Sequence, residues 1–120
     1  KLLINVLKND SVTSNIPIIL FARIIIGSPG AMIETSADCL SLYWSMNDFD
    51  IQFARNKTAL QGNLNPKILL ESKDVIKTET HKLLEKFEDF PGYVFNLGHG
   101  LTPDICPEKV KYLTELVREY

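Results

Sequence analysis

The sequence predicts an α/β fold built on a parallel β-sheet, with about four β/α units. Short apolar segments alternate along the 120 residues with longer amphipathic segments of helical period, and this alternation is typical of β/α units. The apolar segments contain few polar residues, as expected for strands that are buried on both faces.

The chain begins with a helical pattern and reaches its first predicted strand at residues 17–22. Residues 8–15 lie between the two and are polar enough to form a surface loop. The apolar side of the opening helix consists of Leu2, Leu3, Ile4, Val6 and Leu7. Because the chain starts at Lys1 without Met and already in a helical pattern, we expect it to be part of a longer protein.

A short helix is predicted after the first strand, and a second strand follows at residues 39–43. Ser28 before Pro29 combines an N-cap residue with a proline at the first helical position. The apolar positions of this helix are Met32, Ile33 and Ala37. We therefore expect the helix to extend to Ala37.

The next helix and the third strand, at residues 58–61, form the following unit. Asn47 or Asp48 can cap this helix. Phe49 and Phe53 fall on one face of it, where we expect them to pack in the core.

Two further helices frame the fourth predicted strand, at residues 93–97. The long helix at residues 73–87 is followed by Pro91-Gly92, and its apolar stripe is Ile76, Leu83, Leu84 and Phe87. The last helix starts at Pro107, and its apolar positions are Val110, Leu113, Leu116, Val117 and Tyr120.

This succession of elements permits two architectures. Four β/α units form half of a (β/α)8 barrel, whose full length is about 250 residues, and a half-barrel leaves two strand edges open. The same alternation also permits a four-stranded doubly wound sheet with helices on both faces.

Composition excludes several classes of partner. The 13 Lys and Arg residues against 15 Asp and Glu residues form no dense basic cluster, so we expect no nucleic-acid partner. The longest apolar run, residues 16–26, contains Pro17 and Arg23 and is shorter than the roughly 20 residues of a membrane helix, so we expect no membrane segment. Cys39 and Cys106 have no partner at metal-ligand spacing, which favours a reducing, cytoplasmic compartment.

Candidate site residues directly follow the predicted strands, because active sites of parallel barrels lie at the carboxyl ends of their strands. These residues are Arg23; Tyr43 and Trp44; Gln61, Gly62 and Asn63; and Asn96 followed by Gly98, His99 and Gly100. His99 is the best candidate, since an imidazole between two glycines can project into a pocket. Alternatively, His99 only hydrogen-bonds a loop carbonyl.

The other candidates also have structural alternatives. Arg23 can bind a substrate carboxylate or form a structural salt bridge. The amides of segment 61–63 suit a polar ligand, but the spacing favours a turn that leads to Pro66. His81 is expected to be solvated. Three acidic residues are expected to cap helices: Asp38, Asp48 and Asp50.

Two sequence strings are more specific than this spacing. They are Ala59-Leu60-Gln61-Gly62-Asn63-Leu64-Asn65-Pro66 and Phe95-Asn96-Leu97-Gly98-His99-Gly100, the second followed by Pro103-Asp104 and Pro107-Glu108. In order and content they resemble the uroporphyrinogen decarboxylase family, and the similarity extends from residues 17–22 to the end of the chain. The resemblance implies that residues 1–120 are the C-terminal half of a (β/α)8 TIM barrel and part of a single barrel domain.

The resemblance also implies an activity. The family consists of lyases that decarboxylate the acetate groups of uroporphyrinogen III, a tetrapyrrole of haem biosynthesis, to give coproporphyrinogen III. A protonated pyrrole ring takes up the charge, so no metal or organic cofactor is expected. The full-length enzyme is expected to be a cytoplasmic homodimer.

Site residues follow from the same resemblance. His99 falls on the family's C-terminal site histidine, which contacts the substrate and helps to place or protonate it. Arg23 falls on a position that is often basic, which implies a secondary contact to a substrate carboxylate. The family's principal aspartate and arginines lie N-terminal to this region, so the chain alone is expected to lack the main catalytic acid.

Several positions depart from the family pattern. Ile24, Ile25 and Ile26 stand where relatives have small residues, Tyr43 replaces an aspartate, and Asn65 replaces another. The departures leave two interpretations, a working decarboxylase or a catalytically silent half-barrel that acts as a binding or assembly module. Zinc-binding methyltransferases share the barrel, but His99 and Cys106 have no third thiol ligand nearby, which disfavours that class.

Overall fold

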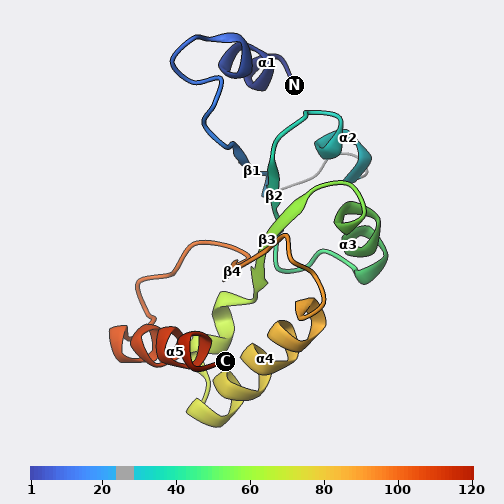
Figure 1. Cartoon of the computed structure of the whole chain (residues 1–120). Helices are drawn as coiled ribbons and strands as arrows, with labels where there is room; N and C mark the ends of the chain where they lie inside the picture. The colour runs from blue at the N-terminus through green and yellow to red at the C-terminus, as the bar shows by residue number, and fades with distance from the viewer. Residues whose placement is uncertain (24–28) are drawn as a thin grey trace.

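The computed structural model describes residues 1–23 and 29–120, and its centre is one four-stranded sheet (Figure 1). The strands are β1 (Ile19–Phe21), β2 (Cys39–Ser41), β3 (Ala59–Leu64) and β4 (Tyr93–Leu97). Each strand pairs in parallel with the strand before it, so their order in space is β1-β2-β3-β4. The predicted α/β fold with a parallel sheet is confirmed.

Helices separate the strands along the chain. They are α1 (Leu2–Asn9), α2 (Pro29–Ile33), α3 (Asp48–Arg55), the 3-10 helix η1 (Pro66–Leu70), α4 (Lys73–Phe87) and α5 (Pro107–Glu119). A doubly wound sheet reverses the direction in which strands are added, which places helices on both faces. The strand order of the described residues never reverses, so the doubly wound alternative is wrong.

Local capping explains where α3 and α4 begin. Asn47 Oδ1 accepts a hydrogen bond of 2.9 Å from the Asp50 amide, while Asn47 Nδ2 donates to the Asp50 carboxylate, also at 2.9 Å. Asn47 is therefore the cap of α3, and Asp48 is not. Ser72 Oγ accepts from the Val75 amide and caps α4, which has the bounds predicted from the sequence.

Other predicted boundaries are wrong. The strand at 58–61 extends to Leu64, whereas the first two strands are shorter than predicted. The α2 helix ends at Ile33, because Glu34, Thr35 and Ser36 form a turn before β2 instead of continuing to Ala37. The proposed cap Ser28 and the three isoleucines at 24–26 lie outside the described residues.

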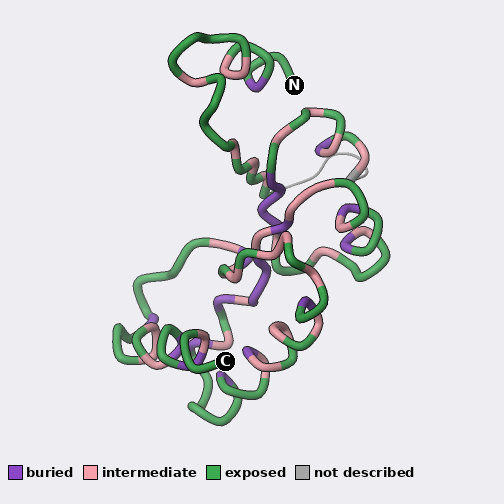
Figure 2. The backbone as a smooth tube through the Cα atoms, in the orientation of Figure 1, coloured by how far each residue is buried: buried purple, intermediate pink, exposed green. Residues whose placement is uncertain are grey.

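Two apolar clusters form the core between the sheet and the helices (Figure 2). The first joins β2 and β3 to α2, α3 and α4 through Met32, Leu40, Leu42, Ile51, Ala54, Leu60 and Phe87. The second joins the end of β3 to η1, α4 and α5 through Leu64, Leu69, Ile76, Ile105, Leu113 and Leu116. Leu83 of α4 packs against both clusters, so this helix connects them.

The opposite face of the sheet is uncovered within the described residues. Ile19 is 51% exposed, Phe21 45% and Val94 49%, although all three belong to strands. Side chains alternate between the two faces of a strand, and only their neighbours on the other face reach the core. The expectation that the strands are buried on both faces is therefore wrong for β1 and β4, whereas every residue of β2 is buried.

Two apolar patterns in helices are also exposed. Phe49 is 81% exposed and Phe53 45%, so the prediction that they pack in the core is wrong; Ile51 and Ala54 form the buried face of α3. Leu2 and Leu3 of α1 are largely exposed, and Ile4 is its buried residue. No helix in residues 1–23 or 29–120 is both long and apolar enough to cross a membrane.

Candidate active site

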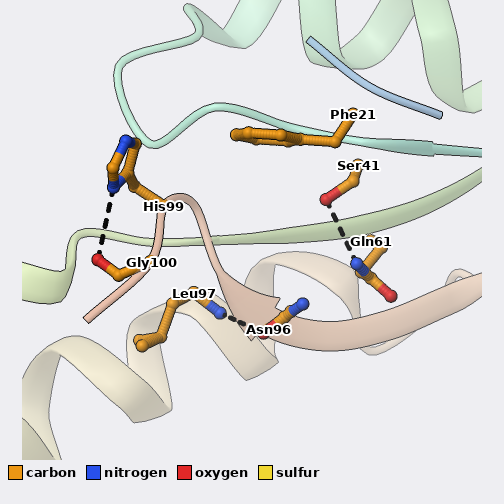
Figure 3. Close-up of a pocket in the computed structure, with 7 residues that line it drawn as sticks. All are labelled: Phe21, Ser41, Gln61, Asn96, Leu97, His99 and Gly100. Atoms are coloured by element: carbon orange, nitrogen blue, oxygen red, sulfur yellow. Dashed lines mark hydrogen bonds between the residues drawn. The ribbon is translucent and has the colours of Figure 1, made fainter. Parts of the chain in front are cut away.

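The uncovered face carries a row of polar side chains across the strands. Strand register places Phe21 beside Ser41, and Ser41 beside Gln61. Two residues after Gln61, on the same face of β3, Asn63 lies beside Asn96 of β4. A cavity of about 280 Å³ opens on this face, lined by Phe21, Ser41, Gln61, Asn96, Leu97, His99 and Gly100 (Figure 3).

His99 lies just beyond the carboxyl end of β4 and is half-buried. Its Nδ1 is 3.2 Å from the Gly100 carbonyl oxygen, so the predicted contact with a loop carbonyl exists. The same side chain also lines the cavity, so the two interpretations of His99 do not exclude each other. Among the described residues, Nε2 has no hydrogen-bond partner.

Tyr43 contacts the His99 ring. The two ring centroids are 6.0 Å apart with an interplanar angle of 79°, an edge-to-face arrangement. Tyr43 therefore limits the orientations of the imidazole. At this position the family resemblance implies an aspartate. The contact with the His99 ring is therefore aromatic, where a carboxylate was expected.

Gly98 brings the ends of three strands together. Its amide donates to the Leu64 carbonyl at 2.8 Å, and its carbonyl accepts from the Trp44 amide at 3.2 Å. A Cβ atom at Gly98 would lie 2.4 Å from the Trp44 nitrogen, closer than real contacts allow. Only glycine fits at this position, and the resulting close approach fixes where the following His99 leaves the sheet.

The 61–63 segment belongs to β3, so the favoured prediction of a turn is wrong. Gln61 Nε2 donates to Ser41 Oγ at 3.1 Å, and Asn63 Nδ2 donates to the Tyr43 carbonyl at 3.1 Å. Gly62 has φ +126°, and its carbonyl accepts a hydrogen bond from the Tyr93 hydroxyl. Burial raises the pKa of Tyr93, which keeps this hydroxyl protonated and able to donate.

The remaining candidates lie outside the cavity. Arg23 is exposed and follows β1, but it does not line the cavity with His99. His81 is partly exposed, in agreement with its predicted place at the surface, and packs edge-to-face on Tyr120, with ring centroids 5.8 Å apart. Asp48 forms an ion pair with Lys86 instead of capping a helix.

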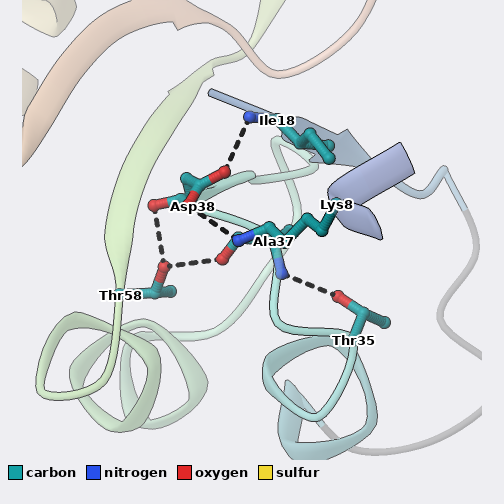
Figure 4. Close-up of polar contacts among 6 residues, drawn as sticks. All are labelled: Lys8, Ile18, Thr35, Ala37, Asp38 and Thr58. Carbon is teal, nitrogen blue, oxygen red and sulfur yellow. Dashed lines mark hydrogen bonds and ion pairs between the residues drawn. The ribbon is translucent and has the colours of Figure 1, made fainter. Parts of the chain in front are cut away.

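Asp38 is also not a helix cap (Figure 4). Its carboxylate accepts a hydrogen bond of 2.8 Å from the Ile18 amide and one of 2.9 Å from Lys8 Nζ. The Ile18 amide and then Lys8 hold the pKa of Asp38 below its usual value. Asp38 thus ties α1 and the start of β1 to the start of β2, at the end of the sheet opposite to His99.

The cysteines do not form a metal site with the described residues. Cys39 is buried in β2, and burial raises the pKa of its thiol. Cys106 is exposed and its Sγ lies 2.5 Å from the Glu108 carboxylate. Within residues 1–23 and 29–120, no group of three His, Cys, Asp or Glu residues is arranged to hold a metal ion.

Comparison with known proteins identifies the family. The profile described as Uroporphyrinogen decarboxylase (URO-D) matches residues 3–120. The chain belongs to the uroporphyrinogen decarboxylase family. Relatives named uroporphyrinogen decarboxylase are 39% identical over 107 residues in Vesicomyosocius okutanii, 38% over 115 in Alcanivorax borkumensis and 41% over 120 in Hydrogenovibrio crunogenus.

These matches cover 88%, 92% and 95% of this chain, but only 31%, 31% and 34% of the relatives. The chain thus spans about a third of the length of the uroporphyrinogen decarboxylases that it matches.

Phe21 and Ser41 line the cavity but were not predicted as site residues. Strand register could have indicated them, because both share a sheet face with Gln61.

Proposed function

We propose that this chain is the C-terminal half of a (β/α)8 barrel and that, within the complete barrel, it takes part in converting uroporphyrinogen III to coproporphyrinogen III. The observation that carries this proposal is the cavity that contains His99. It opens at the carboxyl ends of parallel strands, where barrel enzymes have their active sites, in a chain of the uroporphyrinogen decarboxylase family.

The sheet itself supports the half-barrel. In a closed barrel, one face of every strand points to the interior and the other faces the helices. Here one face packs against helices and the other exposes Ile19, Phe21 and Val94. Within the described residues β1 and β4 each pair with one strand only, so both have an edge free for the strands of a second half.

Each site residue has a proposed role. His99 contacts the tetrapyrrole and helps to place or protonate it, because its Nε2 has no hydrogen-bond partner among residues 1–23 and 29–120 and its ring is oriented by Tyr43. Arg23 is a secondary contact for a substrate carboxylate. The principal acid and the other carboxylate-binding groups come from the remainder of the barrel, and the complete enzyme works as a cofactor-free cytoplasmic homodimer.

A chimeric enzyme tests this function. This chain would replace the matching C-terminal third of the Hydrogenovibrio crunogenus relative, and uroporphyrinogen III decarboxylation would be measured by the coproporphyrinogen formed. We expect the chimera to decarboxylate the substrate and the isolated 120-residue chain to remain inactive. A chimera that folds like its parent but forms no product contradicts the proposal.

Variants of the two histidines locate the activity within the chimera. His99→Ala is expected to lower turnover by about 10²- to 10⁴-fold, the usual effect of losing a proton-transferring side chain, without changing the unfolding midpoint. His81→Ala is the matched control, because His81 packs on Tyr120 away from the cavity. Equal turnover in the two variants would remove His99 from the site.

The silent half-barrel remains the second candidate function. The uncovered sheet face and the two free strand edges suit a module that only binds or assembles with another chain. This function predicts a folded chimera without decarboxylase activity, which is the opposite outcome of the same experiment.

A further inference from the structure

Asn96 lines the cavity beside His99, and its side-chain oxygen accepts a hydrogen bond from the next residue of the chain. The amide of Leu97 donates a hydrogen bond of 2.8 Å to Asn96 Oδ1 (Figure 3). A backbone N–H can only donate, so the atom that it contacts must be the side-chain oxygen. The other end of the side chain, the NH2 group of Nδ2, therefore points away from Leu97.

The Nδ2 group is a hydrogen-bond donor without an acceptor among the described residues. Its neighbours on the same sheet face are engaged, since Asn63 donates to the Tyr43 carbonyl and Gln61 to Ser41. Asn96 is itself exposed, so its donor is accessible to a ligand.

The described residues that line the cavity suit a ligand in which a hydrogen-bond acceptor is attached to a flat apolar group. The lining contains no carboxylate, so no negative charge repels an anionic ligand. Phe21 contributes an exposed aromatic ring to the same cavity, and aromatic rings stack well on one another. A pyrrole ring with a carboxylate side chain has both properties.

We propose that Asn96 is a specificity-determining residue that donates a hydrogen bond from Nδ2 to a side-chain carboxylate of the tetrapyrrole. This inference rests on the proposed function and adds to it a contact for one substrate group. A ligand without an acceptor at this position cannot form this hydrogen bond, so the contact favours ligands that carry a carboxylate there.

Two variants isolate the donor. Asn96→Asp keeps the size of the side chain and the acceptor for the Leu97 amide, and replaces the NH2 group by a negatively charged oxygen. Asn96→Leu removes the donor without adding charge. Asn65→Asp is the matched control: it makes the same chemical change outside this cavity, at a cap where an oxygen still accepts from the Lys67 amide.

The measurement is a fluorescence titration of the chimera with uroporphyrin, the oxidised tetrapyrrole that carries acetate and propionate groups. Asn96→Leu is expected to raise Kd about tenfold, the usual effect of losing a hydrogen bond to a charged group, and Asn96→Asp is expected to raise it further, because the new carboxylate repels the carboxylate of the ligand. Asn65→Asp is expected to leave Kd unchanged. Circular dichroism establishes that every variant is folded.

Three results would overturn the inference: an unchanged Kd in Asn96→Asp, an equal change in Asn65→Asp, or no binding by the chimera without these substitutions. Repeating the titration with coproporphyrin, which retains only propionates, identifies the group. If the Asn96 variants lose affinity for uroporphyrin only, the bound group is an acetate. If they lose affinity equally for both porphyrins, the bound group is a propionate.

The inference and the proposed function can fail separately. If the chimera is active but substitution of Asn96 leaves the Kd for uroporphyrin unchanged, only the role of Asn96 is contradicted. An inactive chimera combined with Asn96-dependent binding removes the decarboxylase function alone.

Discussion

Gly98 and Gly100 flank the same histidine but have different structural roles. The sequence pattern predicts only that both give the backbone freedom around His99. In the structure, Gly98 lies against the Trp44 backbone, whereas a Cβ atom at Gly100 would meet nothing within 4 Å. The need for glycine therefore comes from a contact between two loops, and a single-sequence pattern contains no information about that contact.

This difference gives a prediction for two otherwise identical substitutions. Gly98→Ala should lower the free energy of unfolding by about 1–3 kcal/mol, because the added methyl group must displace the Trp44 backbone. Gly100→Ala should change it by less than about 0.5 kcal/mol. Urea unfolding followed by circular dichroism measures both, and equal midpoints for the two variants would mean that the contact with Trp44 is not tight.

His99 and several of its neighbours, among them Gln61 and Asn96, were candidates from the sequence, but the contact between Tyr43 and His99 was not predicted. The strand before it and the adjacent glycines are local features, and they suffice to place the imidazole at the end of β4. The ring of Tyr43 comes from the loop after β2, far away in the chain. Which side chains meet at the cavity is decided by strand register, which a propensity pattern does not specify.

At the scale of elements, a single carboxylate connects three of them. Asp38 precedes β2 and binds both Ile18, next to β1, and Lys8 of α1 (Figure 4). The sequence suggested a helix cap because Asp38 lies near the end of a helical pattern. Its actual partners are 20 and 30 residues away in the chain, a separation that only the parallel pairing of β1 with β2 brings together.

Asp38→Asn should weaken this connection in a pH-dependent way. The lowered pKa means that the ionised carboxylate stabilises the fold; this contribution is present above the usual pKa of about 3.9 and is lost as the pH falls through the lower value of the folded state. Since Asp38 and Lys8 are partly exposed, we expect a loss of about 0.5 kcal/mol at pH 7. The asparagine oxygen still accepts from Ile18.

Urea midpoints at neutral and acidic pH test this prediction. The difference between Asp38→Asn and the unaltered chain should be present at neutral pH and decrease as the pH falls through the lowered pKa of Asp38, because the protonated carboxyl group is uncharged like the asparagine amide. Asp89→Asn, in the exposed turn after α4, is the control for removing one negative charge. A difference that persists in acid would assign the effect to geometry instead of charge.

Elements with strong local signals were predicted well. The bounds of α4 and β4 agree with the sequence, and α5 begins at Pro107 as expected. The errors lie where distant residues decide. The β3 strand continues to Leu64 because β4 pairs with it from Leu60 to Leu64, and Phe49 is exposed because the other face of α3 packs on the sheet. Propensity and periodicity are local, so they miss both effects.

For the whole molecule, the free edges and the uncovered face predict self-association of the isolated chain. Unpaired strand edges beside apolar side chains such as Ile19 and Phe21 are usual sites of contact between chains. We expect sizing of the purified 120-residue chain, with light scattering, to give species larger than a monomer. A folded monomer would contradict the half-barrel.

One pair of substitutions assigns this association to the sheet. Phe21→Lys places a charge on the uncovered face at the β1 edge and should shift the chain toward the monomer. Phe49→Lys makes the same change on α3, where the ring is more exposed but lies away from the sheet face, and should leave association unchanged. If Phe49→Lys had the larger effect, the contact between chains would involve α3.

The sequential strand order has a consequence for synthesis on the ribosome. Within the described residues, every strand from β2 onward emerges after the strand with which it pairs, because that neighbour is the preceding strand in the chain. Each of these strands can therefore pair with the preceding strand before any later strand has been synthesised. The sheet can thus grow by one strand at a time during translation, in the N- to C-terminal direction in which nascent domains fold. The edge of β4, which carries the residues that lead to His99, is the last to form.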